Sequence, residues 1–166
     1  VLLDLFVEYP YTDAQFLNLW MQADDDELLD QQFKDWEGTA GGTEIVKDFL
    51  KQIKENYPKT VFHGTDVGHT WHSTGPRYLK YLKSTGQQDT EEYKRALENI
   101  VQGRQYYKLL ETDQEAAERY REDRMVENFQ RSYQELEETH RTDIMGIYGN
   151  AHIVNTGYLN AEYYMA

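Results

Sequence analysis

Three short strand-like segments constrain the fold of this chain most, because each is too short to form a typical globular helix. They occupy residues 2–7, 60–67 and 144–148. The first and the last are nearly continuous apolar runs, which are typical of strands buried on both faces of a parallel sheet. Helical stretches separate the three segments, so the order is strand, helices, strand, helices, strand. This order predicts an α/β fold with a mainly parallel sheet flanked by helices.

The stretches between the strands carry the spacing and start signals of helices. Helices are predicted after Thr12 and Thr43, around residues 28–33 and 77–83, and over about 89–110 and 112–138. Capping-box pairs mark three of the starts, namely Thr12/Gln15, Asp89/Glu92 and Thr112/Glu115. The apolar positions expected to be buried are Ile45, Val46, Phe49, Leu50 and Ile53, then Tyr93, Leu97, Ile100, Val101 and Tyr107, and finally Met125, Val126, Phe129, Tyr133 and Leu136.

Length and charge limit the class of protein. A chain of 166 residues is expected to form one domain, here residues 1–166. Its formal net charge of -13 argues against nucleic acid as a partner, because the phosphates would be repelled. The same charge disfavours an anionic membrane surface, and no segment approaches the roughly 18 apolar residues that span a bilayer. The absence of cysteine excludes disulfides and thiolate metal ligands.

The sequence opens inside the first predicted strand and shows no signal peptide. Three strands also make a thin sheet. We therefore expect an incomplete domain, with a further strand and helix upstream of Val1. A soluble protein is expected, cytoplasmic or exported, in an oligomeric state that the sequence leaves open.

Polar residues follow each predicted strand. Glu8 ends the first strand, Asp66 lies at the end of the second, and His152 comes one turn after the third. The carboxyl ends of parallel strands are where α/β proteins place their ligands and their chemistry. We therefore expect a site around His152, for which the common alternative is a hydrogen-bonded structural histidine.

Arg121 and Asn128 are seven residues apart on the last long helix, at the margin of its apolar stripe. Polar side chains at the margin of a buried face are expected to face a boundary between packed elements or a pocket rather than open solvent. The alternative is that Arg121 pairs with an acidic residue of its own helix, which geometry alone slightly favours.

Histidine and aspartate also gather in the stretch after the second strand, at His63, Asp66, His69 and His72. These residue types are good ligands for zinc or iron. Their spacing matches no strong metal motif, and the stretch is predicted to be partly loop. A polar loop near a pocket is therefore favoured over a metal site.

Four segments carry motifs that belong together. RYREDRMVENFQRSYQEL contains the pattern R-[DE]-x-x-M-x-x-N, and VEYPYTDAQFLNLWM leaves a strand at a glutamate and enters a helix. VFHGTDV ends in a Gly-x-Asp motif, and GNAHI contains the motif N-A-H. In this order they resemble the erythromycin esterase-like family, with Thr65 where that family has an aromatic residue. The matching residues are Glu8, Asp66, Arg121, Glu122, Met125, Asn128, Asn150, Ala151 and His152.

The resemblance implies a hydrolase that uses an activated water to cleave an ester or lactone of a small molecule. It implies that Glu8 orients or deprotonates the water, that His152 hydrogen-bonds the water or the leaving oxygen, and that Arg121 stabilises negative charge. The residues that it implies in supporting positions are Asp66, Asn128 and Asn150. Esterases of this family are thought to work without a metal. The related TIKI-type proteases are thought to use one, and Glu8 and His152 would fit either scheme.

The sequence departs from the family in one respect. Family members carry an upstream Gly-Glu-x-x-His-Gly motif, whose histidine is thought to be the general base. Neither His63 nor His69 has that context. Two alternatives to a hydrolase stay open: a haem- or iron-binding protein like the related ChaN-like proteins, with Tyr and His ligands, and a non-catalytic relative. The hydrolase is favoured, and no cofactor is expected.

Overall fold

The computed structural model describes residues 4–139 and 143–152. Its elements, in chain order, are β1 (Asp4–Pro10), α1 (Tyr11–Gln22), α2 (Glu27–Asp35), α3 (Glu44–Asn56), β2 (Val61–Asp66), α4 (Thr74–Ser84), α5 (Glu91–Leu110), α6 (Gln114–Glu138), β3 (Ile144–Ile147) and the short 3₁₀ helix η1 (Asn150–His152). β1 lies in the middle of the sheet, and its pairings with β2 and β3 are both parallel. The predicted α/β fold, a parallel sheet flanked by helices, is confirmed. No helix in this part of the chain is long and apolar enough to cross a membrane.

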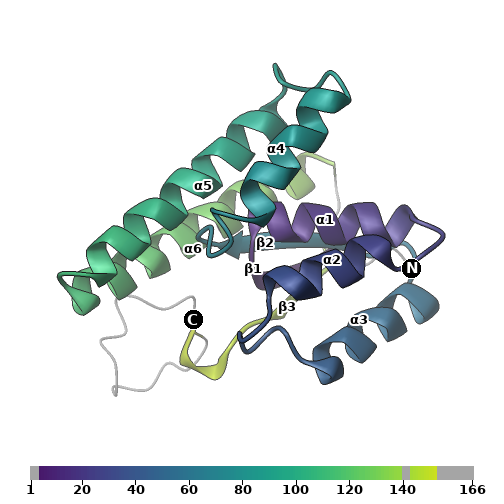
Figure 1. Cartoon of the computed structure of the whole chain (residues 1–166), viewed down its shortest axis with the longest axis horizontal. Coiled ribbons are helices and arrows are strands. Elements are labelled where there is room, and N and C mark those ends of the chain that lie inside the picture. Colours follow the sequence, from purple (N-terminus) through teal and green to yellow (C-terminus); the bar gives the residue numbers. More distant parts are fainter. Residues whose placement is uncertain (1–3, 140–142, 153–166) are drawn as a thin grey trace.

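The sheet has a helical layer on each face (Figure 1). Leu5 and Val7 of β1 pack in one core cluster with residues of α1, α2 and α3. Phe6 points to the other face, where its ring centroid lies 4.7 Å from that of Phe129 in α6. Alternate residues of a strand face opposite sides of a sheet, so β1 is buried on both faces, as predicted. The predicted start of this strand, at residues 2 and 3, lies outside the described residues.

β3 is less buried than its apolar sequence predicts. Ile144 and Ile147 are half-buried, and Met145 is 51% exposed. The prediction of burial on both faces is wrong for this strand because β3 lies at the edge of the sheet and, among the described residues, pairs with β1 alone.

The predicted helices form, and Leu50 and Ile53 of α3 and Ile100 of α5 are buried as predicted. Several other apolar positions that were predicted to be buried are exposed. Ile45 on α3 is 82% exposed, and Leu97, Val101 and Tyr107 on α5 are exposed as well. The buried residues of α5 are Ala96, Asn99, Ile100, Gln102, Gly103 and Tyr106. Small and polar residues lie on this inner face because it meets backbone and polar side chains rather than an apolar sheet.

The helix starts also differ in detail. Pro10 directly precedes α1, so Thr12 lies inside that helix and does not cap it. α5 and α6 are capped by Thr90 and Asp113, each one residue after the predicted position. The predicted cap at Thr43 is confirmed.

Two glycines allow the loop after β2 to touch α5. A Cβ atom on Gly103 would lie 2.0 Å from the backbone oxygen of Gly68, and one on Gly68 would lie 2.3 Å from the backbone oxygen of Asn99. Asn99 also donates from Nδ2 to the backbone oxygen of Asp66, at 2.9 Å. The carboxyl end of β2 is therefore held against α5.

Candidate active site

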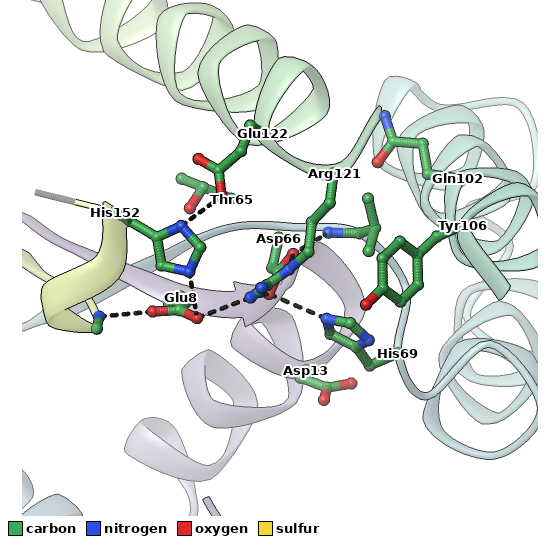
Figure 2. A network of polar contacts seen from close by, with 12 residues as sticks. Glu8, Asp13, Thr65, Asp66, His69, Gln102, Tyr106, Arg121, Glu122 and His152 are labelled. Carbon is green, nitrogen blue, oxygen red and sulfur yellow. Dashed lines mark hydrogen bonds and ion pairs between the residues drawn. The ribbon is translucent and has the colours of Figure 1, made fainter. Parts of the chain in front are cut away.

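The three strands end at one edge of the sheet, and polar residues from four elements meet there (Figure 2). Val7 of β1 is in register with both neighbouring strands, so the carboxyl ends of the three strands lie together. α6 passes over the same edge. The residues that form the contacts are Glu8, Asp66, Arg121, Glu122 and His152.

Arg121 lies at the centre of this group. Its Nε donates to Asp66 Oδ1 at 2.9 Å, and its Nη2 donates to Asp66 Oδ2 at 2.6 Å and to Glu8 Oε1 at 2.7 Å. The side chain is 15% exposed. Both partners come from strands, so the alternative in which Arg121 pairs with its own helix is wrong. The other terminal nitrogen, Nη1, has no hydrogen-bond partner in residues 4–139 and 143–152.

Asp66 is a buried acceptor that joins Arg121 to the loop after β2. Besides Arg121, it accepts from the backbone N–H of Val67 at 2.7 Å. Burial alone raises the pKa of Asp66, but hydrogen bonds from His69 and Arg121 more than offset burial and hold that pKa well below its usual range. Asp66 is therefore ionised at neutral pH.

Glu8 is also held as an anion. Its Oε1 contacts Arg121 Nη2 and, at 3.1 Å, His152 Nε2, while its Oε2 accepts from the backbone N–H of Gly149 at 2.6 Å. Burial alone raises the pKa of Glu8, but hydrogen bonds from His152, Gly149 and Arg121 lower it from 4.5 to about 2. A carboxylate with so low a pKa is a weak proton acceptor at neutral pH.

Gly149 makes the close approach to Glu8 possible. A Cβ atom at this position would lie 3.0 Å from Glu8 Oε2, which is closer than most such contacts in proteins. Gly149 therefore lets the chain after β3 pass directly beside the Glu8 carboxylate.

His152 lies between two carboxylates (Figure 2). Its Nε2 is 3.1 Å from Glu8 Oε1, and its Nδ1 is 2.5 Å from Glu122 Oε1. The Glu122 and Glu8 carboxylates raise the pKa of His152 from 6.5 to about 9, against a smaller opposing effect of burial. His152 is consequently a cation at neutral pH, which makes it a poor general base.

A cavity of about 500 Å³ opens beside this group. Its wall includes Glu8, Asp66 and Arg121, together with the aromatic side chains of Tyr9 and Trp36. The volume falls within the range of small-molecule sites, which is about 300–1,000 Å³. His152 does not line this cavity and touches it only through Glu8.

The two asparagines of the predicted site differ. Asn128 is buried, and its Nδ2 donates to the backbone oxygen of Thr65 at 2.9 Å and to Gln102 Oε1 at 3.1 Å. It therefore fastens α6 to the end of β2. Asn150 is exposed and makes no hydrogen bond within the described residues, so the structure does not bring it to the group.

His69 belongs to the site, although the sequence context did not single it out. Its Nε2 lies 3.1 Å from Asp66 Oδ2, and its Nδ1 lies 3.1 Å from the hydroxyl of Tyr107. Both His69 and Tyr107 line the cavity. A histidine three residues after an aspartate that ends a strand is a sequence signal for a site residue. Its contact with Tyr107 on α5 depends on the tertiary fold.

Asp13 of α1 is a further carboxyl in the cavity wall that the sequence did not indicate. It is fully buried and accepts from Thr70 Oγ1 at 2.5 Å and from Trp36 Nε1 at 2.7 Å. Burial raises the pKa of Asp13 from 3.8 to about 6, and these two hydrogen bonds offset only part of that effect.

Within residues 4–139 and 143–152, no group of three or more His, Asp or Glu side chains has the arrangement of a metal site. The site thus defines a class by its geometry: an α/β protein with an ion-paired arginine at the carboxyl edge of a parallel sheet, next to a small-molecule cavity. Comparisons with protein-family models, curated proteins and solved structures found no match to this chain.

Proposed function

We propose that the protein is a hydrolase that uses water to cleave an ester or lactone of a small molecule. The observation that carries the proposal is Arg121, a guanidinium in the wall of a cavity. Two carboxylates hold it, and its Nη1 makes no hydrogen bond to the residues that the structure describes. The resemblance to the erythromycin esterase-like family supports the same reaction class.

Arg121 has the properties required to stabilise an oxyanion. When water attacks an ester carbonyl, negative charge develops on the carbonyl oxygen, and a preorganised donor lowers the barrier. Asp66 and Glu8 hold the guanidinium in place through Nε and Nη2. Nη1 is then the donor that would contact the substrate oxygen.

Glu8 and His152 act as positioning residues in this proposal. Glu8 fixes Arg121, and protonated His152 donates to Glu8 from the side away from the cavity. Because the pKa of Glu8 is about 2 and that of His152 is about 9, neither is suited to accept a proton from water at neutral pH.

The test is hydrolysis of p-nitrophenyl butyrate, γ-butyrolactone and δ-valerolactone by the purified protein. Arg121→Ala is expected to lower kcat by about 10²–10³-fold, the usual cost of losing an oxyanion donor. Arg121→Lys is expected to lose most activity too, because a lysine cannot reproduce the two-point contact with Asp66.

The matched control is Arg124→Ala. This arginine lies one turn away on α6, pairs with Glu127 and does not line the cavity. It is expected to hydrolyse at the wild-type rate. A folded wild-type protein that cleaves none of the three compounds contradicts the proposal, and a Soret shift on adding haem would then favour the haem-binding alternative.

A further inference from the structure

We propose that His69 is the general base of the site, taking a proton from the attacking water on Nδ1 while Asp66 orients the ring. This inference rests on the proposed hydrolase function and names the group that activates the water.

Asp66 fixes which nitrogen of His69 carries a hydrogen. Nε2 lies 3.1 Å from Asp66 Oδ2. Asp66 is buried and ionised, and an ionised carboxylate only accepts hydrogen bonds. Nε2 therefore carries the hydrogen, and Nδ1 is the nitrogen that can accept a proton. A carboxylate that holds an imidazole in one tautomer is the arrangement that histidine bases use.

Nδ1 of His69 already faces a hydroxyl group. The Tyr107 hydroxyl lies 3.1 Å away, and both side chains line the cavity. Burial raises the pKa of Tyr107, so this hydroxyl keeps its proton and donates it towards Nδ1. Tyr107 is 37% exposed. The attacking water occupies the hydroxyl's place at Nδ1 when the tyrosine turns aside.

His69 and Arg121 are close enough to act on one ester group. His69 Nε2 and Arg121 Nη2 contact the same oxygen, Asp66 Oδ2, at 3.1 and 2.6 Å. Figure 2 shows the imidazole and the guanidinium on the same side of the sheet edge, with Asp66 between them. Because both side chains contact one carboxylate oxygen and line one cavity, a substrate in that cavity can lie near both of them.

The ring of His69 is held in a single orientation. Tyr106 packs edge-on against it, with ring centroids 5.3 Å apart at 90°, and Tyr107 does so at 5.9 Å and 79°. Gly68 and Gly103 allow the loop to approach α5 this closely. A base held by packing and by a carboxylate needs little reorganisation before proton transfer.

Two carboxyl groups of the wall are less suited. Asp13 receives hydrogen bonds on both carboxyl oxygens. Glu8 is held by Arg121, His152 and Gly149. His69 instead presents a ring nitrogen whose partner is a partly exposed tyrosine hydroxyl.

The reaction step balances with water alone. His69 Nδ1 removes one proton from water, and the water oxygen forms a bond to the carbonyl carbon while the C=O π electrons move to the oxygen at Arg121 Nη1. The carbonyl then re-forms as the bond to the alcohol oxygen breaks. The proton on His69 passes to that leaving oxygen, so the products are an acid and an alcohol and the base is regenerated.

The test is chemical rescue of His69→Ala with p-nitrophenyl butyrate as the probe. The variant is expected to lose about 10²–10⁴-fold in kcat, the usual range for a general base. Imidazole added to the medium is expected to restore part of the rate in a saturable way, after subtraction of its own reaction with the ester. Arg121→Ala is the matched control, because its loss is expected to be insensitive to imidazole.

A further measurement separates the outcomes. In ¹⁵N NMR spectra of the wild-type protein, neutral His69 is expected to carry its hydrogen on Nε2. A hydrogen on Nδ1 overturns the inference. This measurement does not depend on whether His69→Ala folds. Hydrolysis at the wild-type rate by His69→Ala overturns the base assignment while the hydrolase function stands. An inactive wild-type protein overturns both.

Discussion

At the scale of single residues, the site is a chain of alternating charges. Glu122, His152, Glu8, Arg121 and Asp66 follow one another, each within 3.1 Å of the next. In this chain Glu8 is held between the cations Arg121 and His152, and each of these cations has two carboxylate partners. Removing the charge of one member of the chain is therefore expected to change the pKa of the neighbour that it contacts.

Glu122→Gln is the cleanest test of this coupling. The hydrogen bond that His152 donates to the Glu122 carboxylate is the largest cause of the raised pKa of His152, so the substitution is expected to lower that pKa from about 9 towards 6.5. The measurement is an NMR titration of the His152 ring. Glu127→Gln, which alters an exposed ion pair on the same helix, is expected to leave the pKa unchanged. A pKa of His152 that stays near 9 in Glu122→Gln contradicts the assignment.

The sequence indicated those site residues whose position follows from the fold class. Glu8, Asp66 and His152 were predictable because strand ends meet at one edge, and Arg121 because it lies at the margin of an apolar stripe. The sequence placed His69 in a polar loop near a pocket, but its contact with Tyr107 was not predictable, because Tyr107 is 38 residues away on α5. Asn150 has the matching motif but points to solvent, since a local motif does not fix the direction of a side chain.

At the scale of elements, the contact of α5 with the loop after β2 decides the position of His69. This contact is backbone against backbone, at Gly68 and Gly103. It also explains the error in the predicted face of α5. The spacing of apolar residues identifies the buried face of a helix that packs on an apolar surface. The buried face of α5 also contains glycine, asparagine and glutamine, which such spacing does not identify. The existence and order of the elements were predictable from period and caps, but this inner face was not.

Gly103→Ala tests the contact. In an unconstrained helix, replacing glycine by alanine stabilises by about 0.5–1 kcal/mol. Here the new Cβ would lie 2.0 Å from a backbone oxygen, so we expect the opposite sign, a loss of about 1–3 kcal/mol from overpacking. Urea unfolding measures it, with the exposed Lys108→Ala as the control on the same helix. A stabilised Gly103→Ala protein would show that α5 does not touch the loop.

At the scale of the whole molecule, the ionic chain fastens the edge of the sheet to α6. β3 is short and only half-buried, and within the described part of the chain it pairs with β1 alone. The segment after it is tied down by the Gly149 N–H on Glu8 and by His152 between Glu8 and Glu122. The stability of this side of the molecule therefore depends on the charge of His152.

The stability of the protein should consequently fall as the pH rises. The folded-state pKa of His152, about 9, lies above its ordinary value of 6.5. The stabilisation from the protonated ring is complete below the ordinary value and is lost as the pH passes through the folded-state value. We expect the urea midpoint of the wild-type protein to decrease between pH 6.5 and pH 9 by more than that of His152→Gln, which has no proton to lose at this position. Groups that titrate in both proteins cancel in the difference. Parallel curves for the two proteins would mean that the carboxylates of Glu8 and Glu122 do not hold the protonated ring.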